Sequence, residues 1–588
     1  MSRTRRYVNL HEEPIRTNYA GTEHMRFREL VLRLQTHHFC QALLIAMLAA
    51  APVQGADLRG PVLGAASNFG QGKKPKVMFL GESFGVKYYR DGMAWARAEK
   101  TPGTTRFQSP RTGYPDKLGP EGASLSMVLN WGNPLYDDGD TPHSPEAIAA
   151  FGSFAGAMVS RFPMIESLEV GNEFNGVNFV RGPLRDMPPL ERARAYVPLL
   201  KAASTEARKV RPGLRVLGGA THSIAAGFLW EVLDAGGADY MDALALHPYT
   251  TPAEQFVRQV GVLRRHPAAA NMPIEVTEFG TVAPERAAAH FLRNYCQFAL
   301  GGVTHAVWYP LNARGDGLVP LISDRGRVTP AGETWELISA SMEGRPVQAL
   351  AADPFTYGCR FDQNVLVIWG APRELTAPDN AEVLDATGKP VVKPYLLDRE
   401  KPLVLRSRDG APLGEVELSE QKVVADSFDQ FAYPEEVGEQ PAADPFERFA
   451  RRGSQIIPLE TMPGQQGPGV PWTPYLGAGM GVRVAADSLL PGGPPSNPVE
   501  IVHRYTAPES GIYSLTARFD VAERSKDGIS VRASLAGRTV YEKAGHGPFA
   551  IEIPNLEMNE KDALEIVVGP NGTAQGDGTK YRITLSRP

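Results

Sequence analysis

Between about residues 57 and 343 the sequence alternates short β-rich runs with longer amphipathic stretches. This alternation is typical of βα units arranged around a parallel sheet. Eight such units predict an α/β protein with a (β/α)8 TIM barrel, whose active site lies at the carboxyl ends of the strands. The predicted strands cover residues 60–66, 86–90, 124–130, 167–173, 214–219, 243–247, 273–278 and 305–310.

Helix signals fill the gaps between these runs. Ser144, Pro145 and Glu146 supply an N-cap, a proline at the first helical position and an acidic residue in the first turn. These residues predict a helix over 147–161. Two more amphipathic stretches, at 190–210 and 284–300, end at Pro-Gly and Gly-Gly pairs.

The helical signals stop after residue 343. Alternating apolar runs over 344–430 predict a small β-sandwich accessory domain. Residues 431–470 are rich in Pro, Gly and Glu without a sustained period, which indicates a linker. Alternation resumes over 471–588 and predicts a second, C-terminal β-sandwich. Trp472 and Tyr475 at its start are candidates for stacking on sugar rings, although core packing is the commoner role of such aromatics.

The N-terminal segment 1–56 has the features of an extension followed by an export signal. Arginines precede a short apolar run at 42–51, and small residues follow it. The apolar run is shorter than the ~20 residues that span a bilayer, so we expect membrane association only if the segment stays uncleaved. The expected location is therefore outside the cytoplasm, either periplasmic or secreted.

Composition excludes several classes of function. The net charge of −5 comes without a basic patch, so no nucleic-acid partner is expected. The histidines form no recognisable metal-binding motif, and no phosphate-binding glycine loop follows a strand, so we expect no metal and no cofactor. Cys40 lies in the presumed signal, and a single bridge between Cys296 and Cys359 stays open.

Two glutamates carry the most chemical information. Glu173 ends the fourth predicted strand and Glu278 ends the seventh, so both are expected at the mouth of the barrel. Such a pair of carboxylates is what glycosidic bond cleavage requires. Glu169 and Glu275 are weaker candidates because each lies inside its strand, and Glu275 is expected to face away from Glu278.

The residues around these glutamates resemble a known group. Asn172-Glu173 and Glu278 are similar to the acid/base and the nucleophile of glycoside hydrolase clan A. Arg90, His247-Pro248-Tyr249 and Trp308 also fall where that clan keeps substrate-contacting residues. Segments 87–91 and 133–137 are most similar to family 39 and related bacterial glycosidases associated with exopolysaccharide.

Each residue near the pair has an expected role. Asn172 would hydrogen-bond the sugar 2-hydroxyl. Asn130, which follows the third predicted strand, is a further candidate substrate contact. Trp308 would offer an apolar face to a sugar ring. Arg90, His247 and Tyr249 are expected to keep Glu278 ionised, and its charge would hold the pKa of Glu173 high.

These residues together predict a retaining glycoside hydrolase that cleaves O-glycosidic bonds of a polysaccharide or oligosaccharide. Two alternatives use the same residues. In one, the barrel is a weakly catalytic or non-catalytic polysaccharide-binding component of exopolysaccharide biosynthesis. In the other, the protein is a transglycosylase, which differs from a hydrolase in how well the acceptor site excludes water.

Overall fold

The computed structural model describes residues 58–80, 84–130 and 132–588. The predicted N-terminal extension and signal, residues 1–56, lie outside this part of the chain. Within these ranges, no helix combines the length and the apolar character needed to cross a bilayer.

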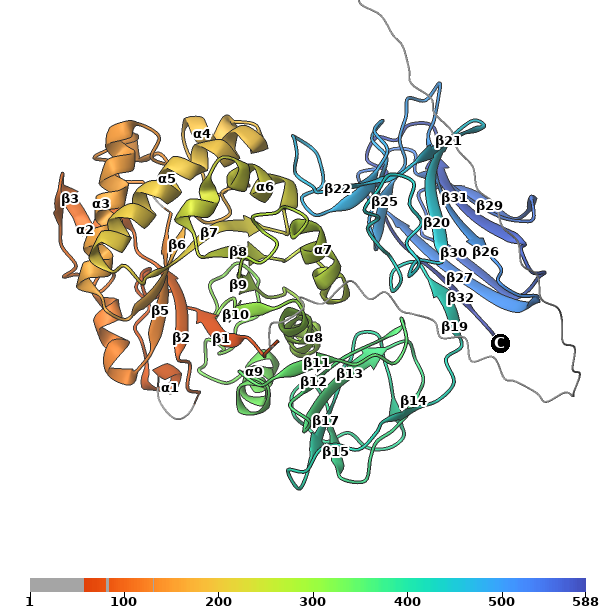
Figure 1. The fold of residues 1–588 in the computed structure, drawn as a ribbon, viewed down its shortest axis with the longest axis horizontal. Coiled ribbons are helices and arrows are strands. Elements are labelled where there is room, and N and C mark those ends of the chain that lie inside the picture. Colours follow the sequence, from red (N-terminus) through yellow and green to blue (C-terminus); the bar gives the residue numbers. More distant parts are fainter. Residues whose placement is uncertain (1–57, 81–83, 131) are drawn as a thin grey trace, which may run out of the picture. The chain divides into compact units, whose positions relative to one another are not determined.

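Eight parallel strands close into a barrel, which confirms the predicted fold class (Figure 1). Their hydrogen-bonded order is β1-β10-β9-β8-β7-β6-β5-β2, and β1 pairs with both β10 and β2 to close the ring. Each predicted strand overlaps one observed strand. The barrel strands are β1 (Val62–Ala66), β2 (Tyr88–Gly92), β5 (Ser124–Leu129), β6 (Ile165–Val170), β7 (Arg215–His222), β8 (Ala243–His247), β9 (Ile274–Phe279) and β10 (Val303–Trp308).

Helices surround these strands (Figure 1). The predicted N-cap is present, because the Ser144 hydroxyl accepts a hydrogen bond of 3.2 Å from the Ala147 amide at the start of α3. A small hairpin of β3 (Glu99–Thr101) and β4 (Thr104–Thr105) follows α2. The helices are α1 (Val77–Leu80), α2 (Trp95–Ala98), α3 (Pro145–Arg161), α4 (Pro183–Asp186), α5 (Pro189–Val210), α6 (Ala226–Asp234), α7 (Phe256–Leu263), α8 (Ala287–Leu300) and α9 (Pro330–Ser341).

Antiparallel sheets follow the barrel. The first β domain has a five-stranded sheet and a three-stranded sheet. A disulfide between Cys296 of α8 and Cys359 of β12 ties this domain to the barrel. The strands are β11 (Val347–Ala349), β12 (Thr356–Phe361), β13 (Val365–Gly370), β14 (Glu374–Thr376), β15 (Ala381–Leu384), β16 (Tyr395–Leu396), β17 (Leu403–Ser407) and β18 (Glu417–Leu418).

The C-terminal region has two further antiparallel sheets, one of eight strands and one of six. The residues that enclose its hydrophobic core come from both sheets. Its strands are β19 (Val423–Asp426), β20 (Phe446–Arg452), β21 (Gln455–Pro458), β22 (Glu460–Met462), β23 (Tyr475–Gly477), β24 (Arg483–Val484), β25 (Ser488–Leu490), β26 (Glu500–Thr506), β27 (Gly511–Val521), β28 (Ile529–Leu535), β29 (Arg538–Gly545), β30 (Phe549–Met558), β31 (Ala563–Pro570) and β32 (Thr579–Ser586).

The predicted linker at 431–470 is wrong in its second half. Strands β20, β21 and β22 lie there, and β20 pairs along its length with β26. Phe446 and Ala450 of β20 are buried in the C-terminal core. The prediction failed because these short strands are separated by Pro and Gly turns, which hide the period of two in the sequence.

The C-terminal sandwich contacts the barrel through polar groups. Gln255, just before α7, donates from Nε2 to the Phe428 carbonyl at 2.9 Å, and Arg265 donates from Nη1 to the Pro434 carbonyl at 3.0 Å. These hydrogen bonds join the sandwich to the barrel directly, in addition to the chain that connects them.

Candidate active site

Glu173 lies in a constrained turn after β6. Its φ of 46° is in the left-handed region, which residues other than glycine seldom adopt. Its amide donates to the Ala220 carbonyl of β7 at 2.7 Å, and this bond holds the turn in place. Such a backbone, held by its surroundings, points to a functional position. The side chain is 11 % exposed and opens at the mouth of the barrel.

Glu278 lies near the end of β9 and has two partners. The Tyr249 hydroxyl donates to its Oε2 at 3.0 Å, and Nη1 of Arg90 donates to its Oε1. The sequence predicts both of these residues beside Glu278, and the structure places both in hydrogen-bond contact with its carboxylate. The side chain is 12 % exposed, so it combines firm support with access to a ligand.

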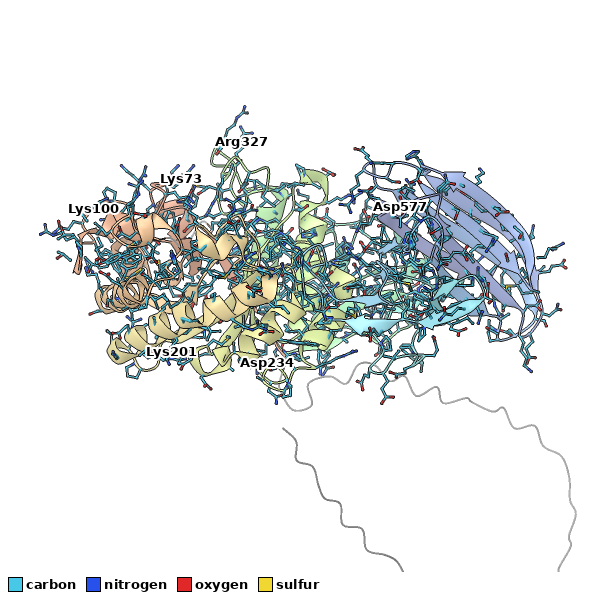
Figure 2. The ribbon with its side chains drawn as sticks, turned by 90° about the horizontal axis from the view of Figure 1, so that it is seen from above. Lys73, Lys100, Lys201, Asp234, Arg327 and Asp577 are labelled. Atoms are coloured by element: carbon cyan, nitrogen blue, oxygen red, sulfur yellow. A yellow bond between two sulfur atoms is a disulfide. The ribbon has the colours of Figure 1, made fainter. Side chains whose placement is uncertain are left out.

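Arg90 of β2 organises the floor of the site. Its Nε and Nη2 bind the two carboxylate oxygens of Glu169 at 2.7 Å each, and Nη2 also donates to Oδ1 of Asn172 at 2.8 Å. The arginine is 5 % exposed and Glu169 is fully buried. Their burial contrasts with charged residues such as Lys100, Lys201 and Arg327, which are exposed and point away from the ribbon (Figure 2).

His247 at the end of β8 lies between the carboxylates. Its Nδ1 is 3.2 Å from Oε1 of Glu173 and 3.8 Å from Oε2 of Glu278, while its Nε2 is 3.0 Å from Oγ1 of Thr277. The ring is fully buried. Burial alone lowers the pKa of His247, but the charge of Glu278 and bonds to Glu169 and Glu173 raise it to about 9.

The pKa of Glu173 differs from the predicted direction. Burial raises it, but the hydrogen bond from His247 and the charges of His247, His222 and Arg90 outweigh burial, so the pKa is lowered. The expectation of a high pKa, maintained by the charge of Glu278, is wrong for the site without substrate. The buried imidazole, which contacts both carboxylates, takes up the proton instead.

The protonation of His247 makes a testable contribution to stability. A group whose pKa is higher in the folded state stabilises below its unfolded pKa of ~6.5, and this stability is lost as pH rises through about 9. Arg90 disfavours the positive charge on His247, whereas Glu169, Glu173 and Glu278 favour it. We therefore expect the stability advantage of the wild type over His247→Gln to fall by ~3 kcal/mol from pH ~6 to pH ~10. Urea unfolding of both proteins across this range measures the difference, and parallel pH profiles would contradict it.

In the described part of the chain, one group of three His, Cys, Asp or Glu side chains lies close enough to share a metal ion. It consists of Glu173, His247 and Glu278, with ligand atoms within 4.8 Å of one another. Their chemistry is a poor match to that role. Arg90 already supplies a cation to Glu278. His247, with its pKa raised to about 9, is a donor at neutral pH and not a free ligand.

The structure corrects the predicted role of Trp308. Its side chain is fully buried, stacked on Phe291 at 4.5 Å between ring centroids and bonded through Nε1 to the Val319 carbonyl at 3.0 Å. It therefore offers no face to a sugar. The helix that packs outside β10 supplies Phe291, and sequence position alone does not show this packing.

Three other predicted substrate contacts lie behind the carboxylates. Arg90 and His247 touch the glutamates and are buried. Asn130 accepts from the Asn172 amide at 3.0 Å and donates to the Phe179 carbonyl at 3.3 Å, so it orients the turn before Glu173. Asn172 and Tyr249 remain at the inner edge of the mouth, where Tyr249 is partly exposed.

Sequence reasoning missed the supporting residues. The sequence offers Glu169 only as a weaker catalytic candidate, yet Glu169 anchors Arg90. Thr277 bridges it to His247 with a hydrogen bond of 3.2 Å to Oε1 of Glu169. Side chains alternate between the two faces of a strand, and this alternation along β6 and β9 could have placed Glu169 and Thr277 inside the barrel. Glu275, the other weaker candidate, is also buried, and its Oε1 lies 2.8 Å from Nε of Arg215.

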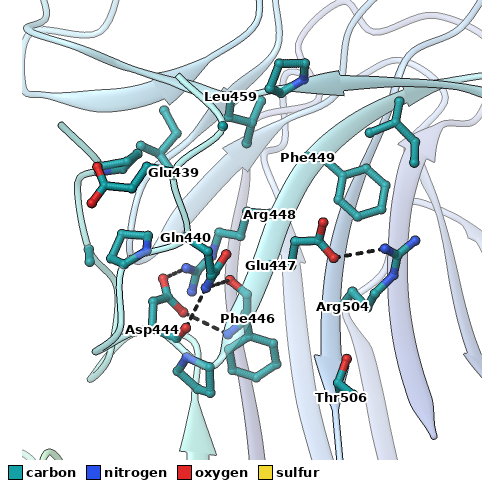
Figure 3. A pocket seen from close by; sticks show the side chains of 18 residues that line it. Glu439, Gln440, Asp444, Phe446, Glu447, Arg448, Phe449, Leu459, Arg504 and Thr506 are labelled. Carbon is teal, nitrogen blue, oxygen red and sulfur yellow. Dashed lines mark hydrogen bonds and ion pairs between the residues drawn. The ribbon is translucent and has the colours of Figure 1, made fainter. Parts of the chain in front are cut away.

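A separate pocket lies in the C-terminal sandwich (Figure 3). It encloses about 430 Å³ between the loop at 438–445 and strand β20. Its polar groups satisfy one another: Asp444 pairs with Arg448 and accepts from the Phe446 amide at 3.0 Å, and Arg504 donates to Glu447 at 2.9 Å. This internal pairing leaves little to orient a ligand, so the barrel mouth is the candidate active site.

Neither the protein-family models nor the curated proteins match this sequence. Among solved structures, a family 39 glycoside hydrolase from the gut symbiont Bacteroides cellulosilyticus WH2 is 18 % identical, covering 60 % of this chain and 82 % of that one, with a TM-score of 0.47. A GH39 β-xylosidase from Caulobacter crescentus is 16 % identical, covering 61 % of this chain and 97 % of that one, with a TM-score of 0.43. A GH39 enzyme from Xanthomonas axonopodis pv. citri is 13 % identical, covering 89 % of this chain and 96 % of that one, with a TM-score of 0.39. Likeness at this level does not define an activity, which must come from the site itself.

Proposed function

We propose that this protein is a retaining glycoside hydrolase that cleaves O-glycosidic bonds of a polysaccharide or oligosaccharide. The observation that carries the proposal is the pair itself. Carboxylate oxygens of Glu173 and Glu278 lie within 4.8 Å at the mouth of a (β/α)8 barrel. Retaining enzymes hold their carboxyls ~5–5.5 Å apart, whereas inverting enzymes need ~6.5–9.5 Å for an intervening water.

In this mechanism Glu278 attacks the anomeric carbon. Arg90 and Tyr249 both donate to its carboxylate and so orient it for attack. Attack forms a glycosyl ester and breaks the bond to the leaving oxygen, which takes a proton from Glu173. Because Arg90 already binds Oδ1 of Asn172, the amide nitrogen of that residue is oriented as a donor to the sugar 2-hydroxyl.

Glu173 must hold a proton when the leaving oxygen departs. His247 Nδ1, 3.2 Å from Oε1 of Glu173, supplies it once a bound sugar excludes water and disfavours the charged pair. Glu173 then acts as the base for the incoming water, and the ester of Glu278 is hydrolysed. The chemistry requires no metal or cofactor.

A panel of plant and bacterial polysaccharides, assayed for new reducing ends, tests the proposal. The wild type is expected to release reducing ends from at least one polymer, and Glu173→Gln to release far fewer. Binding without release by the wild type would instead favour the polysaccharide-binding role in exopolysaccharide biosynthesis.

We also propose that the protein acts outside the cytoplasm, in the periplasm or as a secreted enzyme. The disulfide between Cys296 and Cys359 supports this location, since such bonds persist in oxidising compartments. Export with signal cleavage predicts a mature chain that lacks ~55 N-terminal residues. The intact mass of the protein from its native cells measures this, and recovery of the full N-terminus in the membrane fraction would contradict cleavage.

A further inference from the structure

A loop of the C-terminal sandwich reaches the mouth of the barrel. At the start of α6, the Gly227 amide donates to the carbonyls of Pro463 at 3.3 Å and Gly464 at 3.2 Å. A Cβ at Gly227 would lie 2.2 Å from the Gly464 oxygen, so only glycine permits this approach. The loop is therefore fitted to the barrel at this point.

Gln465 in the same loop bonds to the segment that follows Glu173. Asn175 donates from Nδ2 to Oε1 of Gln465 at 2.7 Å, and Gln465 donates from Nε2 to the Asn175 carbonyl at 2.9 Å. Oδ1 of Asn175 also accepts from the His222 amide at 2.9 Å. Gln465 is 2 % exposed, so these bonds are shielded from water and hold the loop beside the turn of Glu173.

The loop then presents Trp472 next to the site. The indole is 5.0 Å from the His222 ring, edge to face, and its Cη2 would be 3.4 Å from a Cβ on Gly176, three residues after Glu173. The rings of His222 and Tyr249 are 5.8 Å apart, and Tyr249 binds Glu278. Three rings, those of Tyr249, His222 and Trp472, thus lead from the nucleophile toward solvent.

Trp472 also stands out by its exposure. It is 39 % exposed, and no other Trp, Tyr or Phe in the described ranges is as open to solvent. Tyr475, the other aromatic that the sequence offered for sugar stacking, is buried. An indole combines a large, rigid apolar face with a polar N–H, so an exposed indole is suited to contact a ligand that has an apolar face.

We propose that Trp472 is a sugar-binding platform, contributed by the C-terminal sandwich to a subsite beyond the catalytic pair. A pyranose unit of the bound polysaccharide stacks its C–H face on the indole while the scissile bond lies at Glu173 and Glu278. This inference rests on the proposed function, which places the scissile bond of the bound polysaccharide at the two glutamates. It makes the C-terminal sandwich part of the substrate cleft, so that longer chains bind more tightly than short ones.

The test measures binding separately from turnover. The full-length Glu278→Ala protein, with and without Trp472→Ala or Trp472→Phe, is titrated by calorimetry with cellohexaose, xylohexaose and chitohexaose, and with the matching disaccharides. For a hexasaccharide that binds, Trp472→Ala is expected to weaken the affinity about tenfold, while Trp472→Phe keeps most of it. Disaccharide affinity is expected to stay the same. Ile512→Ala, which alters an exposed apolar residue on β27 of the same sandwich, is the matched control.

The outcomes separate the two proposals. Equal hexasaccharide affinity with and without Trp472, or binding of none of the three hexasaccharides, overturns the platform. A Trp472-dependent affinity in a protein whose wild type releases no reducing ends supports the platform and rejects the hydrolase.

Discussion

Glu278→Ala is expected to reduce kcat by ~10³-fold or more, because the variant has no group to form the glycosyl enzyme. The fold should survive, since the side chain is partly exposed and its removal leaves Arg90 bonded to Glu169 and Asn172. Added azide or formate should restore part of the rate by entering the vacated space. The rescued product should be a glycosyl adduct of inverted configuration, identified by mass and proton NMR.

Glu285→Ala provides the matched control for this experiment. Glu285 is an exposed glutamate in the segment just after the same strand, and its loss should leave the rate unchanged. Near-wild-type turnover by Glu278→Ala, or rescue that gives the same product as hydrolysis, would contradict the role of Glu278 as nucleophile.

Arg90→Ala is expected to destabilise the protein by ~3–5 kcal/mol, because Glu169 would be left as a buried charge without its main partner. Burial raises the pKa of Glu169, but the charge and hydrogen bonds of Arg90, aided by His247, lower it to about 2. Activity should fall as well, since Glu278 and Asn172 lose a shared donor. Chemical unfolding measures the stability change.

Arg161→Ala supplies the comparison. Arg161 pairs with Asp116 at 2.6 Å, but the two side chains are 46 % and 42 % exposed, and exposed pairs contribute ~0–1 kcal/mol. The difference between the two variants isolates the effect of burial. A loss of stability in Arg90→Ala no larger than in Arg161→Ala would show that the buried network does not support the fold as described.

The barrel could be predicted from the sequence because its signals are local. Each strand is a short apolar run, and helices such as α3 begin at a cap that is visible in neighbouring residues. The same reasoning located Glu173 and Glu278, because the ends of parallel strands meet at one edge of the barrel. Both inferences use only a residue's position within its own βα unit.

The features that escaped prediction depend on distant parts of the chain. The hydrogen bonds between Asn175 and Gln465 join residues 290 positions apart, and no sequence pattern near either residue predicts these bonds. Trp308 lies within the predicted strand at 305–310, where a sugar contact is expected, but Phe291 of the neighbouring helix stacks on it. The lowered pKa of Glu173 depends on His247 from another strand, so it follows from three-dimensional contact and not from the Asn-Glu pair.

The configuration of the first product tests the central claim most directly. Proton NMR of a hydrolysis reaction, begun with a substrate identified in the polysaccharide panel and recorded before mutarotation, reports the anomer released by the enzyme. With carboxylate oxygens of Glu173 and Glu278 within 4.8 Å, double displacement predicts that the first product keeps the configuration of the cleaved bond. Initial appearance of the opposite anomer would show single displacement by water and would contradict the assignment of Glu278 as nucleophile.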